Sequence, residues 1–152
     1  MLYACDPDWW EVYQGAREFA GERWTQDEEA AQTWGLHYAP SANEAGLCLD
    51  GSCIHRGGNG GYQAINLAVA FGAARILLLG YDMRLGDDGR RHWHGNHPGG
   101  LHKASRYEEW VPRFASMLPD LERAGAEVLN CTPGSALACF PMASLDEALD
   151  PR

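Results

Sequence analysis

Three histidines in the second half of the chain have the spacing of a zinc-binding motif. His92, His94 and His97 follow the pattern His-x-His-x-Asn-His, which differs from that of dinuclear zinc hydrolases in carrying Asn96 where those enzymes carry Asp. Such a site needs further His and Asp ligands well downstream, and His102 is the only later histidine. The motif therefore leaves three interpretations open: a metal-binding hydrolase, a single metal on these histidines, or a solvated loop whose histidines titrate at about pH 6.5. Because the second half of a dinuclear site is missing, we assign no certain metal.

Two arginines beside these histidines form the only basic cluster of an acidic chain. A guanidinium group binds phosphate or carboxylate through two parallel N–H donors, so Arg90 and Arg91 are candidate ligands of an anion. The alternative is a pair of solvated charges. Trp93 lies in the same polar segment, where its ring could stack on a base or a sugar. The other five tryptophans are expected in the core or at a protein interface.

A glycine-rich turn before an apolar helix offers a second place for an anion. Asn59, Gly60 and Gly61 precede a helix expected over residues 62–71, and a helix N-terminus presents free N–H groups and a positive dipole end. The alternative is a tight turn that needs glycine for its backbone. Asp82 follows an apolar strand, and ligands of open α/β sheets bind at that edge. The alternative for Asp82 is a solvated carboxylate that caps a turn.

The elements that must position these residues alternate between strands and helices. The continuous apolar run at residues 75–80 is typical of a strand covered on both faces in a parallel sheet. Residues 84–105 form a long polar loop, which in a compact domain is usually functional or disordered. The pattern predicts one α/β domain over residues 1–152 with a mostly parallel sheet. Strands are expected at 2–5, 23–25, 36–39, 75–80 and 127–131, and helices at 9–19 (capped by Asp8), 25–34 (with a Thr25–Glu28 capping box), 62–71, 107–124 and 144–149.

Composition excludes several classes of partner. The net charge of −9 argues against a nucleic acid or a membrane surface, since both select faces rich in Lys and Arg. The first residues lack the pattern of a secretory signal, and no apolar run approaches the roughly 18 residues of a membrane span, so we expect a cytoplasmic protein. The five cysteines include no Cys-x-x-Cys pair, and we expect most of them to be reduced core residues.

Four segments, read together, resemble one family. In their order and spacing they are similar to the bacterial sialyltransferases of glycosyltransferase family 42, and to a broader group of Rossmann-like proteins. That group includes many phage-encoded members and is related to the archaeal enzyme that pyrophosphorylates hydroxymethylpterin. The resemblance covers roughly residues 50–149, and that to the phage group extends over the whole chain. The segments are residues 60–65 (GGYQAI), 80–83 (GYDM), 92–97 (HWHGNH) and 128–137 (VLNCTPGSAL).

The resemblance implies a Rossmann-like three-layer fold that binds CMP or another nucleotide or nucleotide sugar. His97 matches the histidine that acts as general base toward the acceptor hydroxyl. Gly60, Gly61 and the turn that contains Ser135 match segments near the nucleotide. In this interpretation Arg90 or Arg91 neutralises phosphate and Asp82 orients the nucleotide or the acceptor, in a transfer of a glycosyl or phosphoryl group.

The chain also departs from the family pattern. Members usually begin with a strand and a Gly-x-Gly-Pro-Ser turn that meets the nucleotide, followed by a second strand that ends in Asn, and neither is found here. We therefore expect either a chain truncated at its N-terminus or one that has lost the transferase chemistry. The alternative function is a non-catalytic phage or prophage protein that keeps the fold for binding or assembly. Without those strands a sheet edge near residues 2–3 would be exposed, so we expect a homodimer or a partner chain to cover it.

Overall fold

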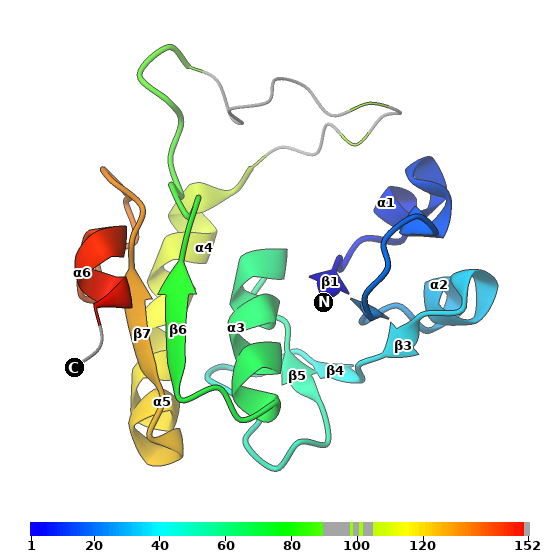
Figure 1. The fold of residues 1–152 in the computed structure, drawn as a ribbon, viewed down its shortest axis with the longest axis horizontal. Coiled ribbons are helices and arrows are strands. Elements are labelled where there is room, and N and C mark those ends of the chain that lie inside the picture. Colours follow the sequence, from blue (N-terminus) through cyan, green and yellow to red (C-terminus); the bar gives the residue numbers. More distant parts are fainter. Residues whose placement is uncertain (90–97, 99–100, 102–104, 151–152) are drawn as a thin grey trace.

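The chain folds into short parallel strands surrounded by helices (Figure 1). The computed structural model describes residues 1–89, 98, 101 and 105–150. Their strands form three separate parallel sheets, of three, two and two strands. The mixed α/β class with parallel strands is therefore confirmed, whereas the described strands do not join into one sheet. No helix within the described ranges is long and apolar enough to cross a membrane.

The N-terminal sheet has the order β1-β2-β3, with β1 at Leu2–Tyr3, β2 at Arg23–Thr25 and β3 at His37–Tyr38. β1 is thus an edge strand, as expected, although the partner that would cover it remains a prediction. The helix expected over residues 9–19 is shorter: α1 spans Pro7–Val12, and a 3₁₀ turn at Gln14–Ala16 follows. Gln14, Gly15 and Ala16 all have positive φ, at 49°, 70° and 48°, so the chain does not continue the helix. Asp6 rather than Asp8 is the N-cap residue, because Pro7 already occupies the first helical turn.

The second helix, α2 (Glu28–Trp34), begins differently from the expected capping box. The side chain of Asp27 accepts the hydrogen bond from the N–H of Ala30, at 2.8 Å, so Asp27 is the cap. The hydroxyl of Thr25 instead accepts from the N–H of Asp27. The predicted end of the helix at Gly35 is confirmed, since this residue has the left-handed conformation.

The middle of the chain forms a parallel pair of strands and the longest helix. β4 (Ser41–Ala42) pairs in parallel with β5 (Ile54–His55), and neither strand was expected from the sequence. α3 (Gly60–Ala70) follows, two residues earlier than predicted, because Asn59 caps it and both glycines take helical positions.

The C-terminal half contains the sheet with the longest described strands. β6 (Arg75–Leu78) pairs in parallel with β7 (Glu127–Asn130), so both strands expected here are confirmed, with ends slightly shorter than predicted. The helix expected over residues 107–124 is divided into α4 (Tyr107–Phe114), a 3₁₀ turn (Ala115–Met117) and α5 (Leu118–Ala124). The change occurs just before Pro119, whose ring blocks a regular helical turn before it. α6 (Leu145–Leu149) follows Ser144, whose side chain caps the helix and completes a capping box with Glu147.

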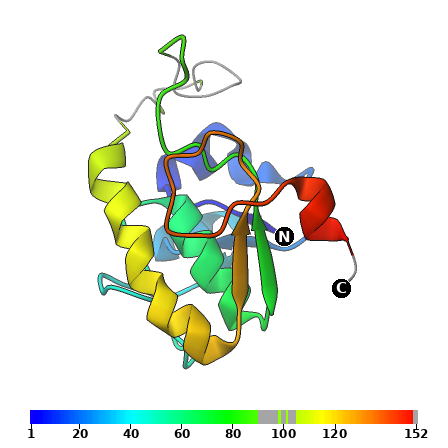
Figure 2. The ribbon, with the colours of Figure 1, turned by 90° about the vertical axis from the view of Figure 1, so that its left-hand side faces the viewer.

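Helices cover both faces of the β6–β7 pair (Figure 2). On one face, Leu78 and Val128 pack with α3 and with the α4–α5 segment, through residues such as Tyr62 and Phe114. On the other face, Leu77 and Leu129 contact Ala148 of α6 in a smaller cluster. Helices therefore cover both faces of β6, as the apolar run predicted. The cover does not extend beyond the strand, since Leu79 is 57% exposed.

Candidate functional site

Three segments that are distant in the sequence meet at the carboxyl end of the β6–β7 pair. Tyr81 and Asp82 follow β6, and the turn that contains Thr132 and Ser135 follows β7. The N–H of Tyr81 donates to the hydroxyl of Thr132 at 2.9 Å, and the hydroxyl of Ser135 donates to the carbonyl of Tyr81. The N–H of Ala136 donates to the carbonyl of Asp82. These bonds hold the two loops side by side and place Asp82 next to the Ser135 turn.

Tyr81 joins this edge to the N-terminus of α3. Its hydroxyl donates to the carbonyl of Gly61 at 3.2 Å, and its ring lies so close that a Cβ atom on Gly61 would be 2.8 Å from Cε1 of the ring. Burial raises the pKa of Tyr81 to about 12, so the phenol is neutral at physiological pH. Gly61 is thus required for close packing against Tyr81, whereas its position inside α3 does not need the unusual backbone of the tight-turn interpretation.

Asn59 both caps α3 and holds an unused donor. Its side-chain oxygen accepts from the N–H of Tyr62 at 3.0 Å. Its amide nitrogen is buried and finds no hydrogen-bond partner among the described residues. Gly60 has more room than Gly61, since a Cβ atom there would lie 3.4 Å from the sulfur of Cys5. A buried donor without a partner costs free energy, so Asn59 keeps an unused hydrogen-bonding capacity at the start of α3.

The two remaining predicted residues at this edge, Asp82 and Ser135, differ in whether their side chains are free to bind a ligand. Asp82 is exposed. Ser135, in contrast, already uses its hydroxyl in two internal bonds, as donor to Tyr81 and as acceptor from the N–H of Leu137. Its role is therefore to hold the turn. Arg84, which sequence reasoning overlooked although it stands two residues after Asp82, donates to the carbonyl of Gly134 at 2.7 Å.

Arg84 brings a positive charge to the same edge. Its guanidinium also pairs with Asp87 at 2.9 Å, and this hydrogen bond, with the charge of Asp87, raises the pKa of Arg84.

Six other predicted residues lie outside the described residues, so their roles stay predictions: Arg90, Arg91, His92, Trp93, His94 and His97.

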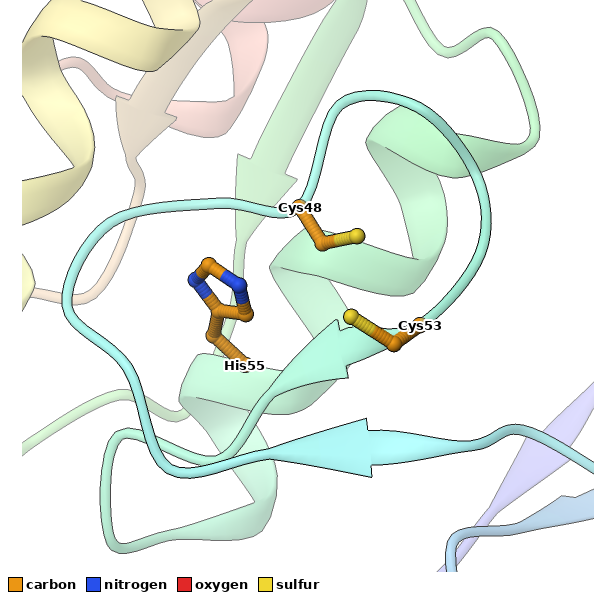
Figure 3. A group of neighbouring side chains, drawn as sticks. All are labelled: Cys48, Cys53 and His55. Carbon is orange, nitrogen blue, oxygen red and sulfur yellow. The ribbon is translucent and has the colours of Figure 1, made fainter.

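A second group of reactive side chains lies beside the middle of α3, and the sequence did not reveal it. Cys48, Cys53 and His55 each offer a ligand atom, and these atoms lie within 4.8 Å of one another (Figure 3). Their spacing, Cys-x4-Cys-x-His, differs from the Cys-x-x-Cys pairs typical of zinc sites. All five cysteines are free thiols, and Cys48 and Cys131 are buried, in agreement with the expectation of reduced core residues. Cys5, Cys53 and Cys139 are half-buried.

Hydrogen bonds perturb the acid–base properties of this second group. The hydrogen bond with Cys48, together with burial, raises the pKa of the Cys53 thiol. Asp50 stands between the two cysteines and accepts from the thiol of Cys48 and from the hydroxyl and N–H of Ser52. These bonds lower the pKa of Asp50 to about 2. The loop thus places a carboxylate beside two thiols.

Comparison of the chain with known protein families, curated proteins and solved structures finds no match. The sites are therefore interpreted from their geometry and from the sequence patterns.

Proposed function

We propose that the chain binds a nucleotide or a nucleotide sugar at the carboxyl edge of the β6–β7 pair, within a Rossmann-like three-layer arrangement. The observation that carries this proposal is the meeting of the α3 N-terminus, the Tyr81–Asp82 segment and the Thr132–Ser135 turn at one edge. Ligands of parallel α/β sheets bind at this edge. The resemblance to family 42 sialyltransferases suggests CMP as the nucleotide.

The phosphate occupies the N-terminus of α3 in this proposal. The helix has eleven residues, long enough for its N-terminal N–H groups and dipole to attract an anion locally, despite the chain's net charge of −9. The side-chain nitrogen of Asn59 gains the acceptor that it lacks. Arg84 adds a positive charge at the same edge, and Arg90 and Arg91 supply further phosphate contacts.

The other groups act on the nucleoside and the acceptor. Asp82 accepts from a hydroxyl of the ribose or of the acceptor, and Trp93 stacks on the base or sugar. In a transfer reaction His97 takes the proton of the acceptor hydroxyl as its oxygen attacks the donor. The non-catalytic alternative is a protein that keeps the fold and binds the same ligand without turnover.

Calorimetric titration with CMP, UMP and GMP, and with their nucleotide sugars, tests the binding site. Asn59→Asp keeps the oxygen that caps α3 but replaces the unused donor by a negative charge, so we expect it to abolish binding while the protein stays folded. Asp82→Asn should weaken binding about tenfold, as expected for the loss of one hydrogen bond to a charged group, worth about 1.5 kcal/mol. Glu18→Gln removes an exposed charge elsewhere and should bind like the wild type. Equal affinity in the wild type and Asn59→Asp would refute the site.

Turnover separates the two candidate functions. If the chain is a transferase, His97→Ala should bind the nucleotide with unchanged affinity but lose product formation, measured with a labelled nucleotide sugar and a glycan acceptor. If the wild type binds but forms no product with any donor and acceptor offered, the non-catalytic alternative holds.

A further inference from the structure

We propose that Cys48, Cys53 and His55 bind one Zn²⁺ ion, at a site separate from the sheet edge. The separation follows from α3: the three residues lie beside Asn66 in its middle, whereas the proposed nucleotide edge lies at its N-terminus. The inference does not depend on the proposed function.

The donor set and its dimensions suit this ion. Two thiolates and one imidazole are ligands that zinc prefers, at about 2.3 Å for sulfur and about 2.0 Å for nitrogen. Around a tetrahedral centre these bond lengths place neighbouring ligand atoms about 3.5–3.8 Å apart. In the structure all three atoms already lie within 4.8 Å of one another. Small side-chain rotations therefore bring them onto one ion, and no backbone rearrangement is required.

The imidazole of His55 is held in the orientation that a metal ligand needs. Its Nδ1 lies 3.2 Å from the carbonyl oxygen of Ala45 and 3.1 Å from that of Gly46. Carbonyl oxygens only accept, so Nδ1 carries the proton and Nε2 keeps its lone pair. Figure 3 shows the other ring nitrogen, Nε2, on the side that faces the two sulfurs. Metal-binding histidines commonly donate their second N–H to a carbonyl in this way.

A buried amide fixes the backbone of two of the ligands. Asn66 is fully buried, and its side-chain oxygen accepts from the N–H groups of both Cys48 and His55, at 3.1 and 2.8 Å. Its side-chain nitrogen donates to the carbonyl of Cys48 at 3.2 Å. A single side chain of α3 thus holds the two segments together before any metal binds, which reduces the ordering cost of binding.

The fourth coordination position faces a cavity. The three ligands themselves line a hollow of about 430 Å³, together with neighbours that include Glu44, Asp50 and Arg123. Glu44 lies at its rim, with a carboxylate oxygen 3.8 Å from Nε2 of His55. Three protein ligands with an open fourth position form the arrangement in which zinc keeps a water or takes an exogenous ligand. Binding replaces the two thiol protons by the ion, so it releases two protons and weakens as the pH falls.

The test is metal binding by the full chain after treatment with a chelator. We expect one Zn²⁺ per chain by elemental analysis after gel filtration, and a thiolate-to-metal charge-transfer band when Co²⁺ replaces Zn²⁺. Cys53→Ser and His55→Gln should each lower the affinity for Zn²⁺ by more than 100-fold, beyond the 10–100-fold loss typical of an outer-sphere partner. Cys139→Ser, which removes another partly buried free thiol, should bind like the wild type.

Two outcomes would overturn the proposal. The first is wild-type binding that survives in Cys53→Ser and disappears in the triple variant His92→Ala, His94→Ala, His97→Ala, because the histidine motif would then be the metal site. The second is a chain that binds no Zn²⁺ under reducing conditions and whose intact mass without reductant shows a Cys48–Cys53 disulfide. The cobalt band is decisive in the first case, since it requires sulfur ligands.

Discussion

The role assigned to Asn66 gives a prediction with a definite magnitude. The substitution Asn66→Ala removes three hydrogen bonds at a position with 0% exposure, and leaves the N–H of Cys48, the N–H of His55 and the carbonyl of Cys48 without their partner. An unsatisfied buried polar group costs about 1–3 kcal/mol. We therefore expect the free energy of unfolding to fall by about 3 kcal/mol or more.

Asn130→Ala is the matched control for this substitution. Asn130 is also fully buried, but its side chain makes two hydrogen bonds, to the carbonyl of Leu137 and from the N–H of Thr132. It lies at the end of β7, a strand that contains none of the three proposed zinc ligands. We expect a smaller loss of stability, about 2 kcal/mol. Urea unfolding followed by tryptophan fluorescence, with a chelator present so that no metal contributes, compares the two variants.

Zinc affinity then separates a general loss of stability from a local effect. Asn66→Ala should bind Zn²⁺ about 10–100-fold more weakly than the wild type, as expected when a group that orients metal ligands is removed. Asn130→Ala should bind it unchanged under conditions in which both variants are folded. A cost below about 1 kcal/mol for Asn66→Ala would refute the reasoning, because the backbone groups would then have found other partners.

Three further predictions concern the rest of the fold. Burial raises the pKa of Tyr81 to about 12, above its value in the unfolded chain. The stability that the neutral phenol contributes should therefore be present below about pH 10 and lost as the pH rises through 12. Spectrophotometric titration of the wild type against Tyr81→Phe checks this. Gly61→Ala should destabilise the protein by about 1–3 kcal/mol, because the new Cβ meets the ring of Tyr81, whereas Gly60→Ala should change the melting temperature little. Ser144→Ala removes a capping box and should cost about 1 kcal/mol, seen as faster hydrogen exchange in α6.

The parts of the fold that the sequence predicts are those governed by local patterns. The apolar run that contains β6, the strand β7 and the helix α3 were expected close to their observed bounds, because each has a clear periodicity or a glycine at its end. β4 was not expected, since the two residues Ser41 and Ala42 carry no strand pattern and pair only because β5 lies beside them. The end of α1 was also missed, since Gln14 and Ala16 have positive φ there although neither residue type signals it in the sequence.

One of the two candidate sites could also be predicted from local sequence patterns, and the other could not. The sheet edge was predictable because a polar residue after a buried strand, such as Asp82, indicates where ligands bind. The internal use of the Ser135 hydroxyl was not, because the carbonyl to which it donates belongs to Tyr81, in a segment distant in the sequence. The cluster of Cys48, Cys53 and His55 depends on Asn66, eleven residues after His55, and on the loop that places the two sulfurs together. Spacing alone does not carry that information.

The most direct test of the proposed function is a thermal-shift comparison of the wild-type chain with nucleotides and nucleotide sugars, each with and without Zn²⁺. A ligand at about 100 times its dissociation constant adds roughly 2.7 kcal/mol of stability, which raises the melting temperature measurably. We predict stabilisation by one class of nucleotide, CMP first, that is absent in Asn59→Asp and additive with stabilisation by Zn²⁺. The absence of any shift with every nucleotide, in a protein that Zn²⁺ does stabilise, would contradict the nucleotide site and leave the metal site standing.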